Sequence, residues 1–117
     1  MKLSIYRIQP YQNFLCSDTV DHLVANFDME KCMQGMEIYA VDANGFRYVV
    51  KEGHHRLFVC HRLGIEKIDF EPKTGLNPII IRAAKDVRRE GIKSVRDLEG
   101  QLHNEFICSM ILMARGG

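Results

Sequence analysis

The sequence lacks tryptophan, has only three prolines, and contains no apolar run long enough to cross a bilayer. Its longest apolar stretch, 110–114, is far shorter than the roughly 18–20 residues that a membrane-spanning helix needs. The segment after Met1 has no apolar export core of roughly 7–15 residues. We therefore expect a cytoplasmic protein with no membrane partner.

The sequence has no large excess of positive or negative charge. The 16 lysines and arginines nearly balance the 15 aspartates and glutamates, which leaves a net charge of +1 and no global field to attract a polyanion. A composition of 46% hydrophobic and 26% charged residues is typical of a globular fold. A chain of 117 residues has room for one domain, so we expect residues 1–117 to form a single unit.

Closely spaced cysteine pairs are also missing. No CxxC metal or redox motif exists among the four cysteines, which are Cys16, Cys32, Cys60 and Cys108. Their wide spacing favours reduced, buried thiols over a disulfide framework. His54 and His61 would lie about 10.5 Å apart along a helix, too far to share one zinc ion, and we expect no metal site.

The order of the predicted elements favours an α+β fold with a small mixed sheet and flanking helices. Alternation and turn signals predict strands at 3–8, 37–43, 46–52, 65–70 and 79–81. Apolar spacing and capping residues predict helices at 17–28, 54–63, 83–90 and 102–114. Asn44-Gly45 predicts a tight hairpin turn, because both residues accept a positive φ, and Gly64 suits a helix C-terminus. Residues 28–36 give no assignable pattern.

One segment combines residues that can bind an anion. Gly53 joins a predicted strand to a predicted helix, whose first turn offers unpaired N–H groups and a partial positive charge. A helical wheel places Arg56 at the N-terminal end of the arc that holds Leu57 and Val59. A cation is unfavourable there by roughly 0.3–1 kcal/mol, and an external phosphate or carboxylate would remove that penalty. The alternative is an internal ion pair with Glu52.

The two histidines beside Arg56 point about 100° apart on a helix. The wheel places His54 with Phe58 and His61, away from the apolar arc, and His55 at the margin of the arc. His55 is therefore the better candidate to contact a ligand or to exchange a proton near pH 7. The alternative is that both are solvated or half-packed side chains.

These residues resemble the ParB/sulfiredoxin-like superfamily, which has a strand, then Gly-x-x-Arg opening a helix, then Leu-Gly and a short strand. The match runs from Ile38 to Phe70, and its Gly-His-His-Arg motif at 53–56 is most similar to the free-serine kinase branch. The resemblance implies that Gly53, His54, His55 and Arg56 contact the phosphates of ATP or CTP, together with Mg²⁺. Position 54 is histidine where sulfiredoxins have cysteine, so sulfinic acid reduction is not expected.

The first functional hypothesis is a nucleotide- or phosphate-binding ParB-like domain with NTPase or small-molecule phosphotransferase activity. The resemblance implies an upstream catalytic acid, for which Glu30 or Asp28 could serve, and it places Glu52 where the kinase branch has aspartate. The candidate catalytic residues are Glu52, His55 and Glu30.

Two other hypotheses remain. A nucleic-acid-binding or nuclease-like ParB domain would use the basic residues Arg82, Lys85, Arg88, Arg89, Lys93 and Arg96. A non-catalytic partner-binding module would use the apolar helix at 102–114, which predicts either core packing or homodimerisation.

Overall fold

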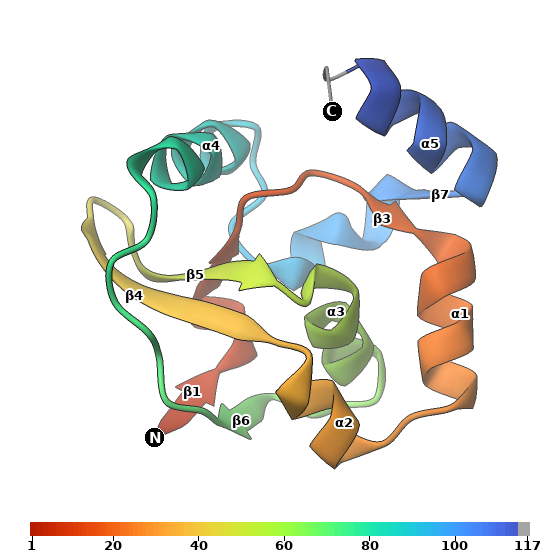
Figure 1. The fold of residues 1–117 in the computed structure, drawn as a ribbon, viewed down its shortest axis with the longest axis horizontal. Helices are drawn as coiled ribbons and strands as arrows, with labels where there is room; N and C mark the ends of the chain where they lie inside the picture. Colours follow the sequence, from red (N-terminus) through yellow and green to blue (C-terminus); the bar gives the residue numbers. More distant parts are fainter. Residues whose placement is uncertain (115–117) are drawn as a thin grey trace.

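A three-stranded sheet and the helix that follows it form the centre of the computed structural model, which describes residues 1–114 (Figure 1). The helices are η1 (Ile5–Arg7), α1 (Ser17–Ala25), α2 (Met29–Gln34), α3 (His54–Arg62), α4 (Pro78–Arg89), η2 (Val95–Gln101) and α5 (Glu105–Ala114), of which η1 and η2 are 3₁₀ helices. The strands are β1 (Lys2–Ser4), β2 (Ile8–Pro10), β3 (Leu15–Cys16), β4 (Glu37–Ala43), β5 (Phe46–Glu52), β6 (Lys67–Asp69) and β7 (Leu102–His103). The last residues of the expected domain, 115–117, lie outside the described part.

The central sheet has the order β2-β5-β4 and is mixed, since β2 runs parallel to β5 and β4 runs antiparallel to it. Two smaller pairs, β1 with β6 and β3 with β7, lie outside this sheet. Neighbouring residues of β5 face opposite sides of the sheet. Val50 packs into the cluster around α3, and Val49 packs with Ala84 of α4. The expected α+β fold with a small mixed sheet and flanking helices is confirmed.

Helix α3 is buried around most of its circumference. Leu57, Phe58 and Cys60 are fully buried, Val59 is 1% exposed, and His54 is only 4% exposed. The sheet, α1, η1 and η2 surround the helix, so it has no broad polar face (Figure 1). The expectation that His54 and Phe58 lie away from the apolar arc is therefore wrong.

The predicted strand at 79–81 is wrong, because these three isoleucines lie in the first turn of α4. The side-chain oxygen of Asn77 accepts a hydrogen bond from the N–H of Ile79 at 2.9 Å, and Pro78 occupies the first helical position. Ile79 is 76% exposed. The cap and the proline therefore override the β preference of the isoleucines.

The two ends of the described chain also differ from the prediction. The expected strand at 3–8 is interrupted by η1, where the hydroxyl of Ser4 accepts a hydrogen bond from the N–H of Tyr6 at 3.3 Å. Helix α5 begins at Glu105 rather than at 102, and its Phe106 and Met113 are 72% and 78% exposed. The helix packs on the rest of the chain through Cys108 and Ile111, while most of its apolar side chains stay exposed, so the expected core packing is found only in part. Within residues 1–114, no helix is long and apolar enough to cross a membrane.

Candidate functional site

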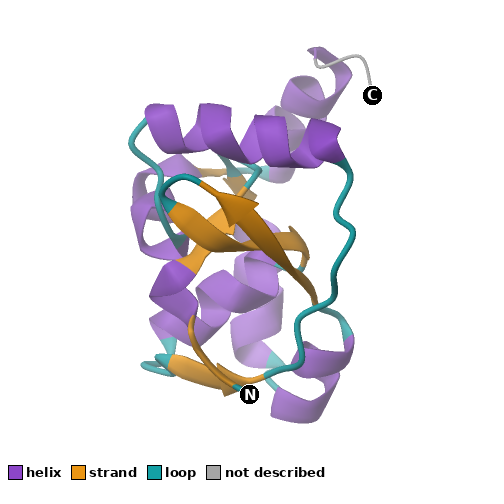
Figure 2. Ribbon diagram, turned by 90° about the vertical axis from the view of Figure 1, so that its left-hand side faces the viewer, coloured by secondary structure: helices purple, strands orange, loops and turns teal. Residues whose placement is uncertain are grey.

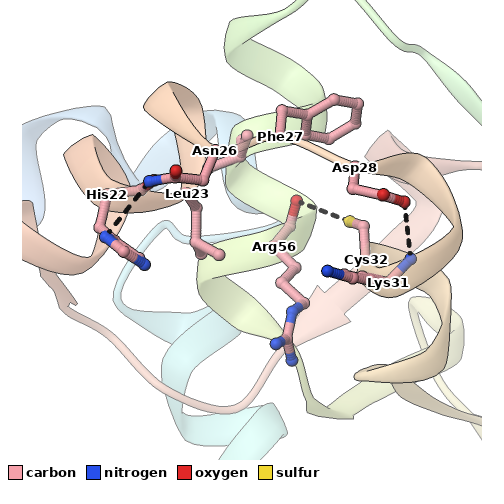
Figure 3. A pocket seen from close by; sticks show the side chains of 9 residues that line it. His22, Leu23, Asn26, Phe27, Asp28, Lys31, Cys32 and Arg56 are labelled. Carbon is pink, nitrogen blue, oxygen red and sulfur yellow. Dashed lines mark hydrogen bonds between the residues drawn. The ribbon is translucent and has the colours of Figure 1, made fainter.

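A cavity of about 240 Å³ lies between α1, α2 and α3 (Figure 3). Helix α2 begins after Asp28, whose carboxylate accepts a hydrogen bond from the N–H of Lys31 at 3.1 Å and thereby caps the helix. The lining residues are His22, Leu23, Asn26, Phe27, Asp28, Lys31, Cys32, Arg56 and Val59. The unassigned segment 28–36 thus supplies one wall of this cavity.

Arg56 enters the cavity from the first turn of α3 and is held there by Gly35. Its Nη1 donates a hydrogen bond to the carbonyl oxygen of Gly35 at 3.3 Å. A Cβ atom at position 35 would overlap the guanidinium group. The φ of Gly35 is −89°, so glycine is needed here for space rather than for backbone conformation. The glycine and the arginine therefore form one structural unit.

The cavity carries more positive than negative charge. The side chain of Lys31 runs from α2 toward that of Arg56 (Figure 3), and both residues line the cavity together with the single carboxylate of Asp28. Within residues 1–114, none of the ion pairs includes Arg56 or Lys31. The alternative ion pair between Arg56 and Glu52 is therefore not formed, and the guanidinium has no anionic partner in the described chain.

The two histidines at the start of α3 bind the backbone of the segment that precedes α1. The Nε2 atom of His54 accepts a hydrogen bond from the N–H of Tyr11 at 3.2 Å, and that of His55 accepts one from the N–H of Cys16 at 2.9 Å. Burial, followed by the charge of His55, lowers the pKa of His54 to about 3, and burial lowers the pKa of His55. Proton exchange by His55 near pH 7 is thus not supported, and both histidines act as neutral acceptors.

Gly53 is required by the turn into α3. Its φ is +102°, in the left-handed region that favours glycine, and a Cβ atom would lie 2.7 Å from Cγ of Met36. The space beside Gly53 is thus filled by the protein itself. Gly53 is not among the residues that line the cavity beside Arg56.

Of the candidate acids, Asp28 alone lines the cavity with Arg56. Glu52 and Glu30 are exposed, and neither they nor His55 line the cavity. Of the seven different residues expected for the phosphate site and its catalysis, the structure brings Arg56 and Asp28 to the cavity. Lys31 and Gly35 escaped the sequence analysis because the methionine-rich segment around them carried no recognisable motif.

A second candidate surface is a basic groove between η1, the β4–β5 turn and α4. The turn lies next to α4 in Figure 2, and the largest hollow there has a volume of about 770 Å³. Three adjoining hollows share lining residues and together gather half of the 16 lysines and arginines, namely Lys2, Arg7, Arg47, Lys67, Lys85, Arg88, Arg89 and Lys93. Asp42 is the one acidic residue that lines them within the described chain.

The basic groove includes only part of the basic set predicted from the sequence. Lys85, Arg88, Arg89 and Lys93 line it, whereas Arg82 does not. The guanidinium of Arg96 lies 4.0 Å above the ring of Tyr6, in a cation–π contact. Sequence analysis missed the other four basic residues because they lie far from 82–97 along the chain, at Lys2, Arg7, Arg47 and Lys67.

Arg88 is fixed within the basic groove. Its Nη1 donates a hydrogen bond to the side-chain oxygen of Gln9 at 3.2 Å, and a Cβ atom at Gly45 would lie 2.8 Å from its Nε. Gly45 has a φ of +97°, whereas no residue other than glycine has a positive φ within residues 1–114. The predicted turn is therefore present, but Asn44 does not adopt the positive φ expected of it.

Comparison with known proteins supports the fold. No family model matches the chain, and no curated protein matches it. The crystal structure of protein Atu1540 from Agrobacterium tumefaciens is similar, with a TM-score of 0.58 and 17% sequence identity, over 99% of this chain and 69% of that chain. At this identity the likeness concerns the arrangement of helices and strands, which both chains share.

Proposed function

We propose that the chain binds a phosphate-bearing small molecule, a nucleotide such as ATP or CTP, with its phosphate groups in the cavity beside Arg56. One observation carries the proposal: a half-buried guanidinium lines a cavity and donates to a backbone carbonyl, with no carboxylate of the described chain paired to it. Lys31 adds a second cation to the same cavity. Charge-assisted hydrogen bonds to phosphate are the interactions that such a pair makes best.

The size of the cavity indicates which part of the ligand it holds. Small-molecule sites commonly measure about 300–1,000 Å³, and this cavity of about 240 Å³ is smaller. It suits phosphate groups, while the sugar and base would extend along the surface. The ParB/sulfiredoxin-like resemblance agrees with this proposal, since it also assigns Arg56 to phosphate.

An NTPase or phosphotransferase activity would have to use Asp28, the one carboxylate among the residues that line the cavity. Within residues 1–114, no group of three or more metal-ligating side chains is present. A magnesium ion would therefore arrive with the nucleotide, held mainly by phosphate oxygens. Glu30, Glu52 and His55 would act on a phosphate only after a rearrangement of the chain.

A thermal-shift series tests the phosphate site. Pyrophosphate, ATP and CTP, each with and without Mg²⁺, are added to the full chain, with inorganic phosphate as the smallest probe. A ligand at 100-fold excess over its Kd adds about 2.7 kcal/mol, which raises the Tm by about 10 °C in a domain of this size. Arg56→Gln should weaken binding about 10–100-fold, because it removes a charge-assisted contact.

Two further variants localise the effect. Gly35→Ala should also reduce the response, because the added methyl group displaces the guanidinium, whereas Gly100→Ala meets no atom within 4 Å and should not. Arg62→Ala removes an arginine from the other end of α3, where it pairs with Glu99 at 2.9 Å, and should keep the response. If Arg56→Gln responds like the parent chain, the phosphate site lies elsewhere.

The basic groove favours a second candidate function, the binding of nucleic acid. Its eight cations face a single lining carboxylate, although the whole chain carries a net charge of only +1. Phosphate backbones are recognised by such a local excess of positive charge, with an affinity that falls steeply as salt rises. Tyr48 also lines the groove and offers an aromatic side chain to a base.

Fluorescence anisotropy with a labelled single-stranded oligonucleotide tests the basic groove. The slope of log K against log salt should become less steep by about 1–2 when Arg47→Ala and Lys93→Ala are combined, because two phosphate contacts are lost. Arg62→Ala, outside the groove, should leave the slope unchanged. Equal slopes for the double variant and the parent would exclude the groove as the interface.

We also propose a cytoplasmic location and an association through α5. The four cysteines are free thiols, which suits a reducing, cytoplasmic compartment. The exposed apolar residues of α5 would suit a homodimer or a partner-binding module. A stable dimer that responds to none of the phosphate probes would favour the module over the nucleotide-binding domain.

A further inference from the structure

Two thiols face each other across the contact between α2 and α3. The Sγ atoms of Cys32 and Cys60 are 4.0 Å apart in a hydrogen bond, both side chains are buried, and neither sulfur is in a disulfide. The thiol of Cys32 also lies 3.9 Å from the carbonyl oxygen of Arg56. The residues are 28 positions apart in the sequence, so the fold rather than a local motif brings them together. A disulfide has an S–S length of about 2.05 Å, so closing the pair needs a movement of about 2 Å.

The two sulfurs differ in access and in charge. Cys32 lines the cavity beside Arg56, whereas Cys60 is fully buried behind it. The hydrogen bond with Cys60, and to a lesser degree the charge of Arg56, lowers the pKa of the Cys32 thiol, while the same hydrogen bond and burial raise the pKa of Cys60. An oxidant entering the cavity thus meets Cys32 first, and Cys32 is the sulfur with more thiolate character.

The other two cysteines provide a comparison inside the same chain. Cys16 and Cys108 also lie in one buried cluster. The thiol of Cys108 donates to the carbonyl oxygens of His103 and Leu15 at 3.5 and 3.6 Å, and burial raises its pKa to about 11. The Cys108 thiol therefore reacts slowly with oxidants. At Cys16, burial is outweighed by hydrogen bonds, chiefly with Thr19, which lower the pKa of the thiol, but neither Cys16 nor Cys108 lines the cavity between α1, α2 and α3.

We propose that Cys32 and Cys60 form a redox-active pair that a hydroperoxide converts into a disulfide. The Cys32 thiolate attacks the terminal peroxide oxygen, the O–O bond breaks, and the leaving alkoxide takes up a proton, so that Cys32 becomes a sulfenic acid. The Cys60 sulfur then attacks the Cys32 sulfur, the S–O bond breaks, and hydroxide leaves as water with the proton of Cys60. Two thiols thus lose two electrons to one hydroperoxide, giving a disulfide, an alcohol and water.

Cys32 lies on a short helix. The helix is only six residues long, so a small shift of this one element would bring the two sulfurs to bonding distance. Closing the disulfide would draw Cys32 out of the cavity wall and toward α3. The redox pair goes beyond the proposed phosphate site and does not depend on a ligand being bound there.

Peptide mapping of the full chain under non-reducing conditions tests the proposal. After treatment with hydrogen peroxide or cumene hydroperoxide, the Cys32 and Cys60 peptides should be recovered as one cross-linked species that dithiothreitol separates. Cys16 and Cys108 should remain available to a thiol alkylating reagent. A cross-link between Cys16 and Cys108 instead, sulfinic acid at Cys32 without a cross-link, or four unreacted thiols would each overturn the proposal.

The order of the two steps is tested with single variants. In Cys60→Ser, a sulfenic-acid probe such as dimedone should label Cys32, whereas in Cys32→Ser it should not label Cys60. Cys108→Ser should form the Cys32–Cys60 cross-link at the same rate as the parent. Labelling of Cys60 in Cys32→Ser would contradict the assignment of Cys32 as the attacking sulfur. The cross-link in the parent chain can be read even if a variant fails to fold.

Discussion

The chain is expected to lose about 2 kcal/mol of stability between pH 6.5 and pH 5 through His54 alone. The ordinary pKa of histidine is about 6.5, and the buried His54 has a pKa of about 3. The unfolded chain therefore binds a proton in this range and the folded chain does not. The contribution of His54 to the free energy of unfolding is fully present above pH 6.5. Below that pH it falls by about 1.4 kcal/mol per pH unit, until His54 is protonated in the folded chain near pH 3.

Urea unfolding at several pH values between 7.5 and 5 measures this loss. His54→Gln should flatten the curve, because the amide oxygen can accept the hydrogen bond from Tyr11 N–H that Nε2 accepts in the parent, and glutamine does not titrate. His55→Gln should flatten it further, since the pKa of His55 is also lowered by burial. If the free energy of unfolding depended on pH equally in the parent and in His54→Gln, His54 would take up its proton in the folded chain as readily as in the unfolded chain, and the prediction would be wrong.

Gly53→Ala is expected to destabilise the chain by about 2–4 kcal/mol. A left-handed backbone costs an L-residue about 1–2 kcal/mol, and the φ of Gly53 is +102°. The new methyl group would also lie 2.7 Å from Cγ and 3.2 Å from the backbone Cα of Met36. Overpacking of this kind typically costs about 1–3 kcal/mol. Chemical denaturation of the variant and the parent gives the difference directly.

Gly64→Ala is the matched control at the other end of α3. Gly64 has a φ of +76°, but a Cβ atom there would meet nothing within 4 Å. This substitution should cost only the backbone term of about 1–2 kcal/mol. If the two alanine variants were equally stable, the contact between position 53 and Met36 would contribute nothing, and the close packing of that turn would be refuted.

Sequence analysis predicted the centre of the fold well, because its signals are local there. The observed strands β4 and β5 have the predicted bounds, and α3 begins at the predicted residue and ends one residue early. Asn44-Gly45, Gly53 and Gly64 mark the three boundaries of this region. Each glycine takes a positive φ, so each acts as a strong stop signal.

The errors in the fold arise where tertiary contacts override local preference. The isoleucines at 79–81 have a high preference for strands, yet they belong to α4 because Asn77 caps the helix and Pro78 fits its first turn. The burial of His54 was missed because a helical wheel assumes one apolar face. Helix α3 is surrounded on most sides, which the spacing of its own residues cannot reveal.

The candidate site was predicted in part. Arg56 was identified because a cation among core positions at a helix N-terminus is unusual. Its neighbours Lys31 and Gly35 come from a segment 21–25 residues earlier in the chain, and only the folded chain shows that they meet Arg56. The basic groove could not be found from a window of sequence, since its cations come from four separate parts of the chain.

The contact between Gly35 and Arg56 couples these two positions of the sequence. No side chain fits at position 35 while the guanidinium occupies its place, because even a Cβ atom would overlap it. Related sequences that replace the arginine by a small residue would be released from this constraint and could carry alanine or serine at 35. In an alignment of homologous sequences, this coupling would be visible as covariation between positions 35 and 56.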